Sequence, residues 1–192
     1  MRARPLGVPM LLGLLVAAAS LIAGCGTAVP APAPKAVAAT VSAQPSAAVP
    51  AQPTVAAVPA TLSFNGKTLD GAAFHASAMA GKPAILWFWA PWCATCASEA
   101  QSIADLATQY QGRLGILGIA GLGDNKAMHQ FVSDLDVGDV PHLDDQAGVV
   151  WKKFGITQQS TYVFLDRTGK IVKTGYLDDL QLTAEVKSLT SS

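Results

Sequence analysis

Hydrophobic residues divide the chain into an apolar leader, a long segment without a sustained period, and a region of alternating strand-like and helix-like patterns. Within that region the run 84–90 is apolar throughout and too short for a buried helix, which is typical of a buried strand. Residues 93–110 then carry apolar side chains at helical spacing, and Gly112 supplies a C-terminal stop. The pattern predicts a strand that runs directly into a helix.

Further strands and helices are expected on either side of this unit. Downstream, the pattern predicts a strand over 113–120, a helix from about residue 125 and an extended piece at 141–143. A short helix capped by Asp145 follows. The chain then continues with two strands, at 161–165 and 170–176 around the turn 166–169, and a last helix from Asp178 or Asp179. Upstream, Asn65-Gly66 separates two short apolar segments and is a strong signal for a two-residue hairpin turn.

The order of these elements predicts the fold class. Helical crossovers join parallel strands, whereas the short turn at 166–169 requires an antiparallel pair. We therefore predict an α/β fold with a mixed central sheet, helices on both faces, an N-terminal hairpin and a small central insertion. Residues 61–192 are enough for one well-packed core and not for two, so they are expected to form a single domain.

Residues 1–24 have the features of a signal peptide. Arg2 and Arg4 precede an apolar stretch that is short for a bilayer core of about 30 Å. The stretch ends in Leu21-Ile22-Ala23-Gly24-Cys25, which resembles a bacterial lipobox. We expect Cys25 to be lipidated and to hold the protein in the cell envelope, on the outer face of the cytoplasmic membrane. The alternative is an ordinary secretory signal followed by a stray cysteine.

The segment 25–60 is rich in alanine and proline and contains no aromatic residue, which predicts an extended linker and not a domain. The whole chain has a formal net charge of +0, and the domain carries no basic stripe. Nucleic-acid binding therefore has no electrostatic support.

Of the three cysteines, Cys25 is assigned to the lipobox, which leaves Cys93 and Cys96 to pair with each other. They lie at the predicted strand-to-helix junction, where free amide groups and the helix dipole favour a thiolate. Redox exchange is the leading interpretation, with Cys93 as the attacking thiolate and Cys96 as the resolving thiol. A purely structural disulfide would close too small a loop to stabilise much. A zinc site would need two more ligands, and no histidine stands at ligand spacing to another, so no metal or other cofactor is expected.

The motifs around these cysteines resemble a known family. The segment Trp87-Phe88-Trp89-Ala90-Pro91-Trp92-Cys93-x-x-Cys96, together with Phe164-Leu165-Asp166 and Thr168-Gly169-Lys170, resembles the thioredoxin fold. Within it, the chain is most similar to the membrane-tethered extracytoplasmic branch of TlpA, ResA, DsbE and DsbF proteins, and in particular to actinobacterial DsbF-type lipoproteins. The resemblance covers about residues 62–189.

The resemblance implies a thiol-disulfide oxidoreductase that oxidises cysteines of exported proteins and exchanges electrons with a membrane redox partner. It also implies that Glu99 shuttles the proton of Cys96; the alternative is a first-turn acid that only complements the helix dipole. Trp92 is expected to shield the disulfide and border the client groove. The backbone edge at Gln159, Ser160 and Thr161 is expected to bind the client.

One position departs from the family pattern. Members of this fold usually place a cis-proline just before the strand that ends at Asp166, and this chain has Ser160 there, preceded by Gln159. A non-proline cis bond costs about 3–4 kcal/mol, so the Gln159–Ser160 bond need not be cis. We predict that the Ser160 hydroxyl reaches the sulfur of Cys93 and donates a hydrogen bond to its thiolate.

Three other functions compete with the oxidase. A reductant for a dedicated client such as apocytochrome c uses the same chemistry in reverse, and the sequence leaves this direction open. A copper chaperone with the thioredoxin fold would use both cysteines and a histidine, but such proteins normally separate their cysteines by three residues and carry a histidine that this chain lacks after Lys170. A peroxidase is disfavoured because no Thr-x-x-Cys arrangement occurs in 81–96.

Overall fold

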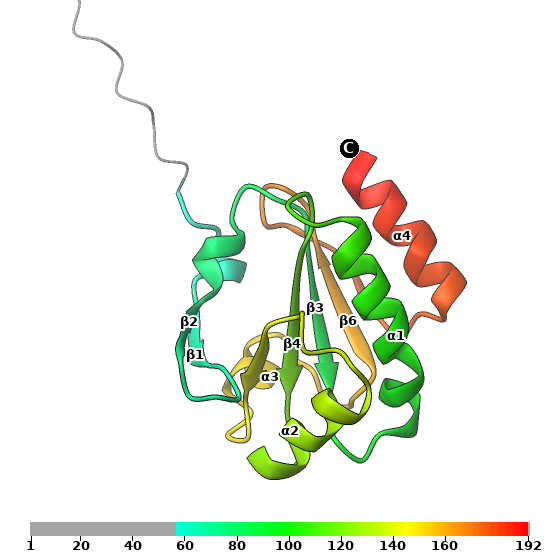
Figure 1. Ribbon diagram of the computed structural model, residues 1–192. Helices are drawn as coiled ribbons and strands as arrows, with labels where there is room; N and C mark the ends of the chain where they lie inside the picture. Colours follow the sequence, from blue (N-terminus) through cyan, green and yellow to red (C-terminus); the bar gives the residue numbers. More distant parts are fainter. Residues whose placement is uncertain (1–56, 192) are drawn as a thin grey trace, which may run out of the picture. The chain divides into compact units, whose positions relative to one another are not determined.

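The computed structural model describes residues 57–191, so the predicted signal peptide, Cys25 and most of the linker lie outside the described residues. The elements, in chain order, are η1 (Ala60–Leu62), β1 (Asn65–Lys67), β2 (Ala73–His75), η2 (Ala76–Met79), β3 (Ala84–Trp89), α1 (Ala94–Gln109), β4 (Gly115–Ala120), α2 (Asn125–Asp134), β5 (His142–Asp144), α3 (Val149–Lys153), β6 (Thr161–Leu165), β7 (Ile171–Gly175) and α4 (Asp179–Ser191). The strand–helix unit at the cysteines is thus formed as predicted, by β3 and α1 (Figure 1).

The central sheet is mixed, which confirms the predicted fold class. Its strand order is β5-β4-β3-β6-β7. Strands β3, β4 and β5 are parallel, because helices α1 and α2 return the chain to the same edge, whereas β6 runs antiparallel to both β3 and β7. Strand β3 lies in the middle of the sheet and is buried at every residue.

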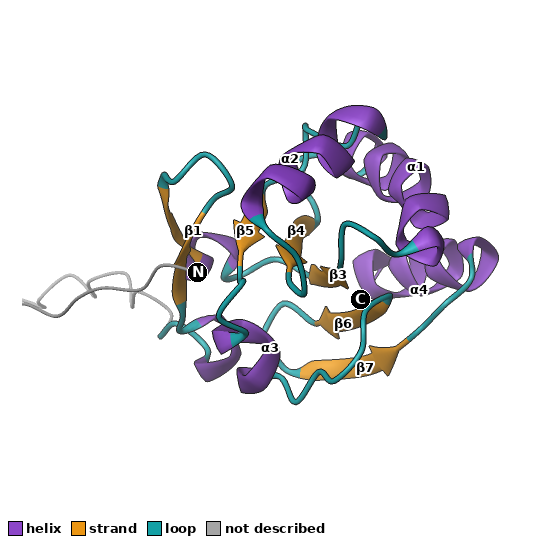
Figure 2. Cartoon of the chain, turned by 90° about the horizontal axis from the view of Figure 1, so that it is seen from below, coloured by secondary structure: helices purple, strands orange, loops and turns teal. Residues whose placement is uncertain are grey.

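Helices cover both faces of the sheet (Figure 2). Helices α1, α2 and α4 pack on one face, where Ile103, Phe131 and Val186 join a single hydrophobic cluster. The other face is covered by η1, η2 and α3, which contribute Leu62, Met79 and Trp151. Burial on both faces explains why the residues of β3 are all apolar and do not alternate between apolar and polar.

The N-terminal hairpin exists, but the prediction of its turn was wrong. Asn65 and Gly66 lie inside β1, where Asn65 pairs with His75 of β2. His75 Nδ1 also donates to Asn65 Oδ1 at 2.7 Å. The chain reverses at 68–72 instead, where the Thr68 amide donates to the Ala72 carbonyl at 2.8 Å and Gly71 adopts a φ of +81°. Cross-strand pairing and the Asp-Gly step at 70–71 therefore outweighed the Asn-Gly signal.

Asp145 caps helix α3, as predicted. Its buried carboxylate accepts hydrogen bonds of 2.9 Å from the amides of Val149, Val150 and Trp151. The residue that directly precedes the helix is Gly148, which is in the left-handed conformation. One carboxylate thus satisfies three free amides of the helix N-terminus from a position three residues upstream of Gly148.

Gly118 of β4 faces the buried ring of His142. This ring accepts a hydrogen bond from Trp89 Nε1 (3.2 Å) and donates one from Nε2 to the Val137 carbonyl (3.1 Å). Burial lowers the pKa of His142 to about 4, so the ring is neutral at ordinary pH. A Cβ on residue 118 would overlap the His142 ring and lie 2.9 Å from Trp89 Nε1. The close packing of His142 and Trp89 therefore requires glycine at position 118.

We predict that Gly118→Ala lowers the free energy of unfolding by at least about 1–3 kcal/mol, because the added methyl group overpacks the core around His142. Denaturant unfolding of the oxidised protein measures this change. Gly138→Ala is the matched control, since the nearest atom to its new Cβ would be 3.8 Å away. Equal stability of the two variants would contradict the close packing described here.

Candidate active site

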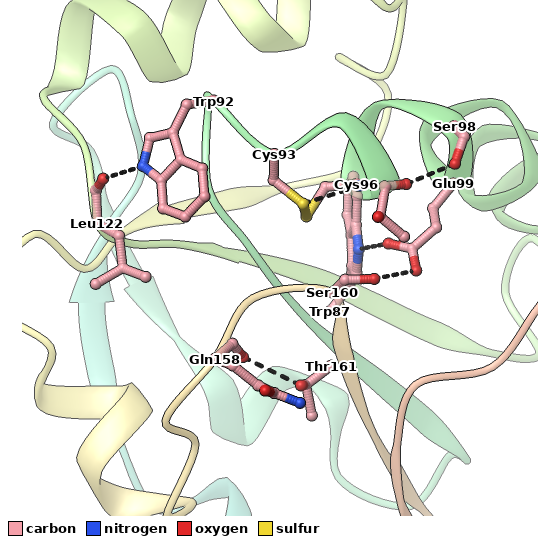
Figure 3. The surroundings of a disulfide bond; sticks show 11 residues. Trp87, Trp92, Cys93, Cys96, Ser98, Glu99, Leu122, Gln158, Ser160 and Thr161 are labelled. Carbon is pink, nitrogen blue, oxygen red and sulfur yellow. Dashed lines mark hydrogen bonds between the residues drawn. A yellow bond between two sulfur atoms is a disulfide. The ribbon is translucent and has the colours of Figure 1, made fainter.

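The two cysteines lie where the buried strand β3 passes into helix α1 (Figure 3). Cys93 is the residue that caps the helix, and it forms a disulfide with Cys96, one turn further on, at a Cα–Cα distance of 5.2 Å. The exposed fraction is 6% for Cys93 and 0% for Cys96. An incoming thiolate therefore reaches the sulfur of Cys93 and not that of Cys96.

The N-terminus of α1 is arranged to stabilise negative charge on Cys93. The amide of Cys96 donates to Cys93 Sγ at 3.0 Å, so this sulfur occupies the place of a helix-capping oxygen. The helix dipole points its positive end at the same atom. Both effects favour the thiolate once the disulfide is opened, which is the requirement for an attacking or leaving cysteine.

Glu99 is buried on the same side of α1 as Cys96, three residues further along. Only 3% of Glu99 is exposed, and it lies beyond the first turn of the helix, so it does not fit the alternative of a first-turn acid. Its Oε1 accepts a hydrogen bond from Ser160 Oγ (2.6 Å) and its Oε2 accepts one from Trp87 Nε1 (2.9 Å). Burial raises the pKa of Glu99, and these two hydrogen bonds lower it in part.

Ser160 has a left-handed backbone, with a φ of +58°. Proline is fixed near −65°, so it does not fit the conformation seen at this position. In the disulfide form the Ser160 hydroxyl donates to Glu99, whereas the sequence predicted a bond to the Cys93 thiolate of the reduced form. The structure thus assigns the hydroxyl a partner that the sequence did not suggest.

A cavity of about 340 Å³ lies in front of the disulfide, lined by Cys93, Thr95, Gln158, Gln159, Ser160 and Tyr176. Two of the three residues expected to bind the client, Gln159 and Ser160, therefore border the reactive sulfur. Thr161 is buried behind them, where its hydroxyl donates to the Gln158 carbonyl at 3.1 Å and holds the loop.

Trp92 flanks the disulfide next to Cys93 in the chain. It is 60% exposed, and its Nε1 donates to the Leu122 carbonyl at 2.7 Å (Figure 3). The same Leu122 lines a second cavity of about 400 Å³ together with Trp151 and Ile156. Trp92 is directed at Leu122 and is not among the residues that line the cavity in front of Cys93, so its expected roles in shielding the disulfide and bordering the client groove stay predictions.

Sequence reasoning missed two aromatic residues of the site, Trp87 and Tyr162. The sequence singled out Trp87 only as part of the segment that carries the family resemblance, and its contact with Glu99 was not foreseen. The buried hydroxyl of Tyr162 finds no hydrogen-bond partner among the described residues, although it lies near enough to Glu99 to influence its pKa. The alternation of side chains along β6, which puts Tyr162 and Phe164 on the face of α1, was a usable signal.

Among residues 57–191, no three His, Cys, Asp or Glu side chains are grouped as a metal site. In the same range, no helix is both long and apolar enough to cross a membrane.

Comparison with known proteins places this geometry in a family. The model of the AhpC/TSA family matches residues 58–174, which is most of the domain. The chain belongs to this family. It is also 36% identical over 143 residues to the soluble secreted antigen MPT53 of Mycobacterium tuberculosis, a match that covers 72% of this chain and 82% of that protein.

Two solved structures of similar proteins indicate which activity this family member has. MTB DsbF, solved in mixed oxidised and reduced forms, has 42% sequence identity and a TM-score of 0.65, and the match covers 69% of this chain and 99% of that one. A secreted disulfide oxidoreductase of M. tuberculosis homologous to E. coli DsbE has 34% identity and a TM-score of 0.61, with coverage of 67% and 98%. The protein is thus a thiol-disulfide oxidoreductase with the thioredoxin fold, which confirms the sequence-based prediction of enzyme and family.

We predict that Cys96→Ser accumulates mixed disulfides between Cys93 and client thiols, because the resolving sulfur is missing, and that Cys93→Ser abolishes exchange. Non-reducing electrophoresis after incubation with a reduced, cysteine-containing client measures both effects. The double variant is the control for non-specific crosslinks. Normal turnover by Cys96→Ser would contradict the assigned roles.

Proposed function

We propose that this enzyme is a lipid-anchored, extracytoplasmic oxidase that forms disulfides in exported proteins. The observation that carries the proposal is the buried Cys93–Cys96 disulfide, in which only Cys93 is open to solvent and the Cys96 amide is already directed at its sulfur. The names of the relatives, which include a secreted disulfide oxidoreductase, support the same activity and compartment.

In the proposed reaction a client thiolate attacks Cys93 Sγ. The client–Cys93 bond forms, the Cys93–Cys96 bond breaks, and its electron pair remains on Cys96. Glu99 gives its proton to that sulfur and becomes a carboxylate. A second client thiolate then attacks the client sulfur of the mixed disulfide, so the client is oxidised by two electrons and Cys93 leaves as a thiolate. A membrane redox partner is needed to restore the disulfide.

The contacts around Cys93 favour the oxidising direction. An oxidase is a protein whose dithiol form is stabilised, and the Cys96 amide and the dipole of α1 both stabilise a Cys93 thiolate. The reverse reaction, reduction of a dedicated client such as apocytochrome c, uses the same groups. The two functions differ in the reduction potential of the couple, which decides between them.

The cavity in front of Cys93 is the proposed binding site for the client. Its lining combines the amides of Gln158 and Gln159, the hydroxyls of Thr95 and Tyr176, and no charged side chain. Such a surface suits an extended polypeptide without demanding a charge on it. Broad acceptance of exported proteins is consistent with this neutral, polar lining.

The anchor is proposed from the lipobox at Cys25 and from the way the described chain enters the domain. The Thr61 hydroxyl donates to the Gly169 carbonyl in the β6–β7 turn, and Lys153 Nζ donates to the Ala60 carbonyl at 2.9 Å. This turn lies at the end of the sheet where β3 begins, and the disulfide follows the end where β3 stops (Figure 1). The described chain thus enters the domain at the end of the sheet opposite to Cys93.

The function is tested by the reduction potential of the Cys93–Cys96 couple. We expect a value nearer about −120 mV than about −270 mV, because the site stabilises the thiolate and therefore the dithiol form. Equilibration with glutathione buffers, followed by quantification of free thiols, measures it. A value near that of a reducing thioredoxin would refute the oxidase and support the reductant.

We predict that the protein partitions with membranes and that Cys25→Ala abolishes both its lipidation and its processing as a lipoprotein. Membrane fractionation of the native host, with mass spectrometry of the mature N-terminus, measures both effects. MPT53 is named a soluble secreted antigen, so release into the medium with an unmodified N-terminus is the result that would contradict the anchor.

A further inference from the structure

Ser160 combines a buried hydroxyl with a backbone conformation that non-glycine residues rarely adopt. Its φ is +58° and its exposed fraction is 8%. A left-handed backbone is strained for such a residue and persists only where the surroundings impose it. The contact that accompanies it here is the 2.6 Å hydrogen bond from Ser160 Oγ to Glu99 Oε1.

This hydrogen bond links the open side of the active site to its buried side. Ser160 lines the cavity in front of Cys93, whereas Glu99 lies inside the protein, on the same helix as the buried Cys96 (Figure 3). The cavity is where a client arrives, and Cys96 is where a proton is needed when the disulfide opens. Ser160 therefore lies between the client and the group proposed to carry the proton.

The groups that face the Glu99 carboxyl are few. Trp87 from β3 and Ser160 from the loop before β6 donate to it. The Tyr162 hydroxyl from β6 lies near it and favours the charged form, while Asp179 at the start of α4 repels that form. Burial is the largest influence and raises the pKa of Glu99. The hydrogen bond from Ser160 opposes this effect of burial most strongly, followed by the bond from Trp87.

We propose that Ser160 is a positioning residue for proton transfer: its hydroxyl holds the Glu99 carboxyl group behind Cys96 and stabilises the carboxylate left when the proton moves to the Cys96 sulfur. The inference deepens the proposed function, because it rests on Glu99 as the proton carrier. The electron balance is unchanged: the client thiolate adds to Cys93, the disulfide electron pair stays on Cys96, and the Glu99 proton neutralises it.

Loss of the hydroxyl has a predictable sign. A hydrogen bond to a carboxylate favours the charged form, so its removal raises the pKa of Glu99 still further. A bond of this kind corresponds to a change of roughly one to two pKa units. In a plot of the exchange rate against pH, the limb is the part of the curve that follows the ionisation of Glu99. This limb moves to higher pH by the same amount, whether Glu99 acts as an acid in oxidation or as a base in reduction.

The test uses the oxidised protein labelled with ¹³C at glutamate carboxyl carbons, titrated by NMR. Ser160→Gly removes the hydroxyl and accepts the left-handed backbone, while Ser160→Ala removes the hydroxyl and keeps a Cβ. We expect the Glu99 pKa to rise by about one to two units in both variants. Ser98→Ala is the matched control, because this neighbouring hydroxyl donates to the Thr95 carbonyl and not to Glu99; it should leave the pKa unchanged.

A second readout ties the titration to the reaction. The rate of disulfide opening by reduced glutathione, expressed per glutathione thiolate, is followed against pH. We expect the limb to move with the Glu99 pKa in both Ser160 variants and to vanish in Glu99→Gln. An unchanged Glu99 pKa in Ser160→Gly, a shift in Ser160→Gly but not in Ser160→Ala, or a limb that does not follow the titration would each overturn the inference.

These outcomes are separate from those of the proposed function. The titration needs neither a client nor a redox partner, and the shift has the same sign in both directions of exchange. A reduction potential typical of a reductant would therefore refute the oxidase and leave the Ser160 inference standing. A potential typical of an oxidase with an unmoved Glu99 pKa would do the opposite.

Discussion

The burial of the Glu99 carboxyl group behind the disulfide is the constraint on which the rest of the site depends. A buried carboxyl is costly unless hydrogen-bond donors satisfy it. Here the donors come from Trp87 in β3 and Ser160 before β6, while Glu99 itself lies on α1. Three separate elements must therefore pack in one register before the Glu99 carboxyl group is satisfied, so this buried network forms only when the sheet and α1 are correctly assembled.

The same packing separates the two sulfurs. Since α1 lies against the sheet, both cysteines border the hydrophobic cluster, but Cys96 is fully buried there, whereas Cys93 at the helix end also lines the cavity. Position along one helical turn thus decides which sulfur meets a client. Trp87 and Trp89, stacked with ring centroids 5.7 Å apart, belong to the same hydrophobic cluster as Cys96. Which sulfur is accessible therefore depends on the residue at which α1 begins, and the packing of β3 in the sheet sets this residue.

The parts that could be predicted from the sequence are those governed by local pattern. The buried strand, the helix after it and the placement of Cys93 and Cys96 follow from hydrophobic periodicity and from the proline that precedes the motif. The turn assigned to Asn65-Gly66 was wrong because pairing between β1 and β2 placed that dipeptide inside a strand. Local propensity specifies a turn only when the neighbouring strands leave it unpaired.

The site network could not be predicted because it depends on contacts between distant elements. Nothing in the sequence near Trp87 specifies that its indole nitrogen meets Glu99 of the following helix. Ser160 was correctly placed beside the disulfide from its spacing to Asp166, but the partner of its hydroxyl depends on the sign of φ at that residue. A left-handed backbone turns the side chain by a large angle, and spacing along the chain carries no information about it.

With Ser160 in the place where members of this fold usually carry proline, the loop that lines the cavity in front of Cys93 depends on its hydrogen bond to Glu99. Proline would fix φ by its ring and offer no donor, so a loop built on it keeps its shape whatever the state of Glu99. With serine, a left-handed backbone that costs on the order of 1–3 kcal/mol is held by a hydrogen bond to Glu99. Such a bond is worth about 0.5–1.5 kcal/mol to a neutral carboxyl group and about 1.5–3 kcal/mol to a carboxylate, so it offsets the cost of the backbone more fully when Glu99 is ionised. The loop that lines the cavity in front of Cys93 thus keeps its shape through a contact with a buried titratable group, and not through a proline ring.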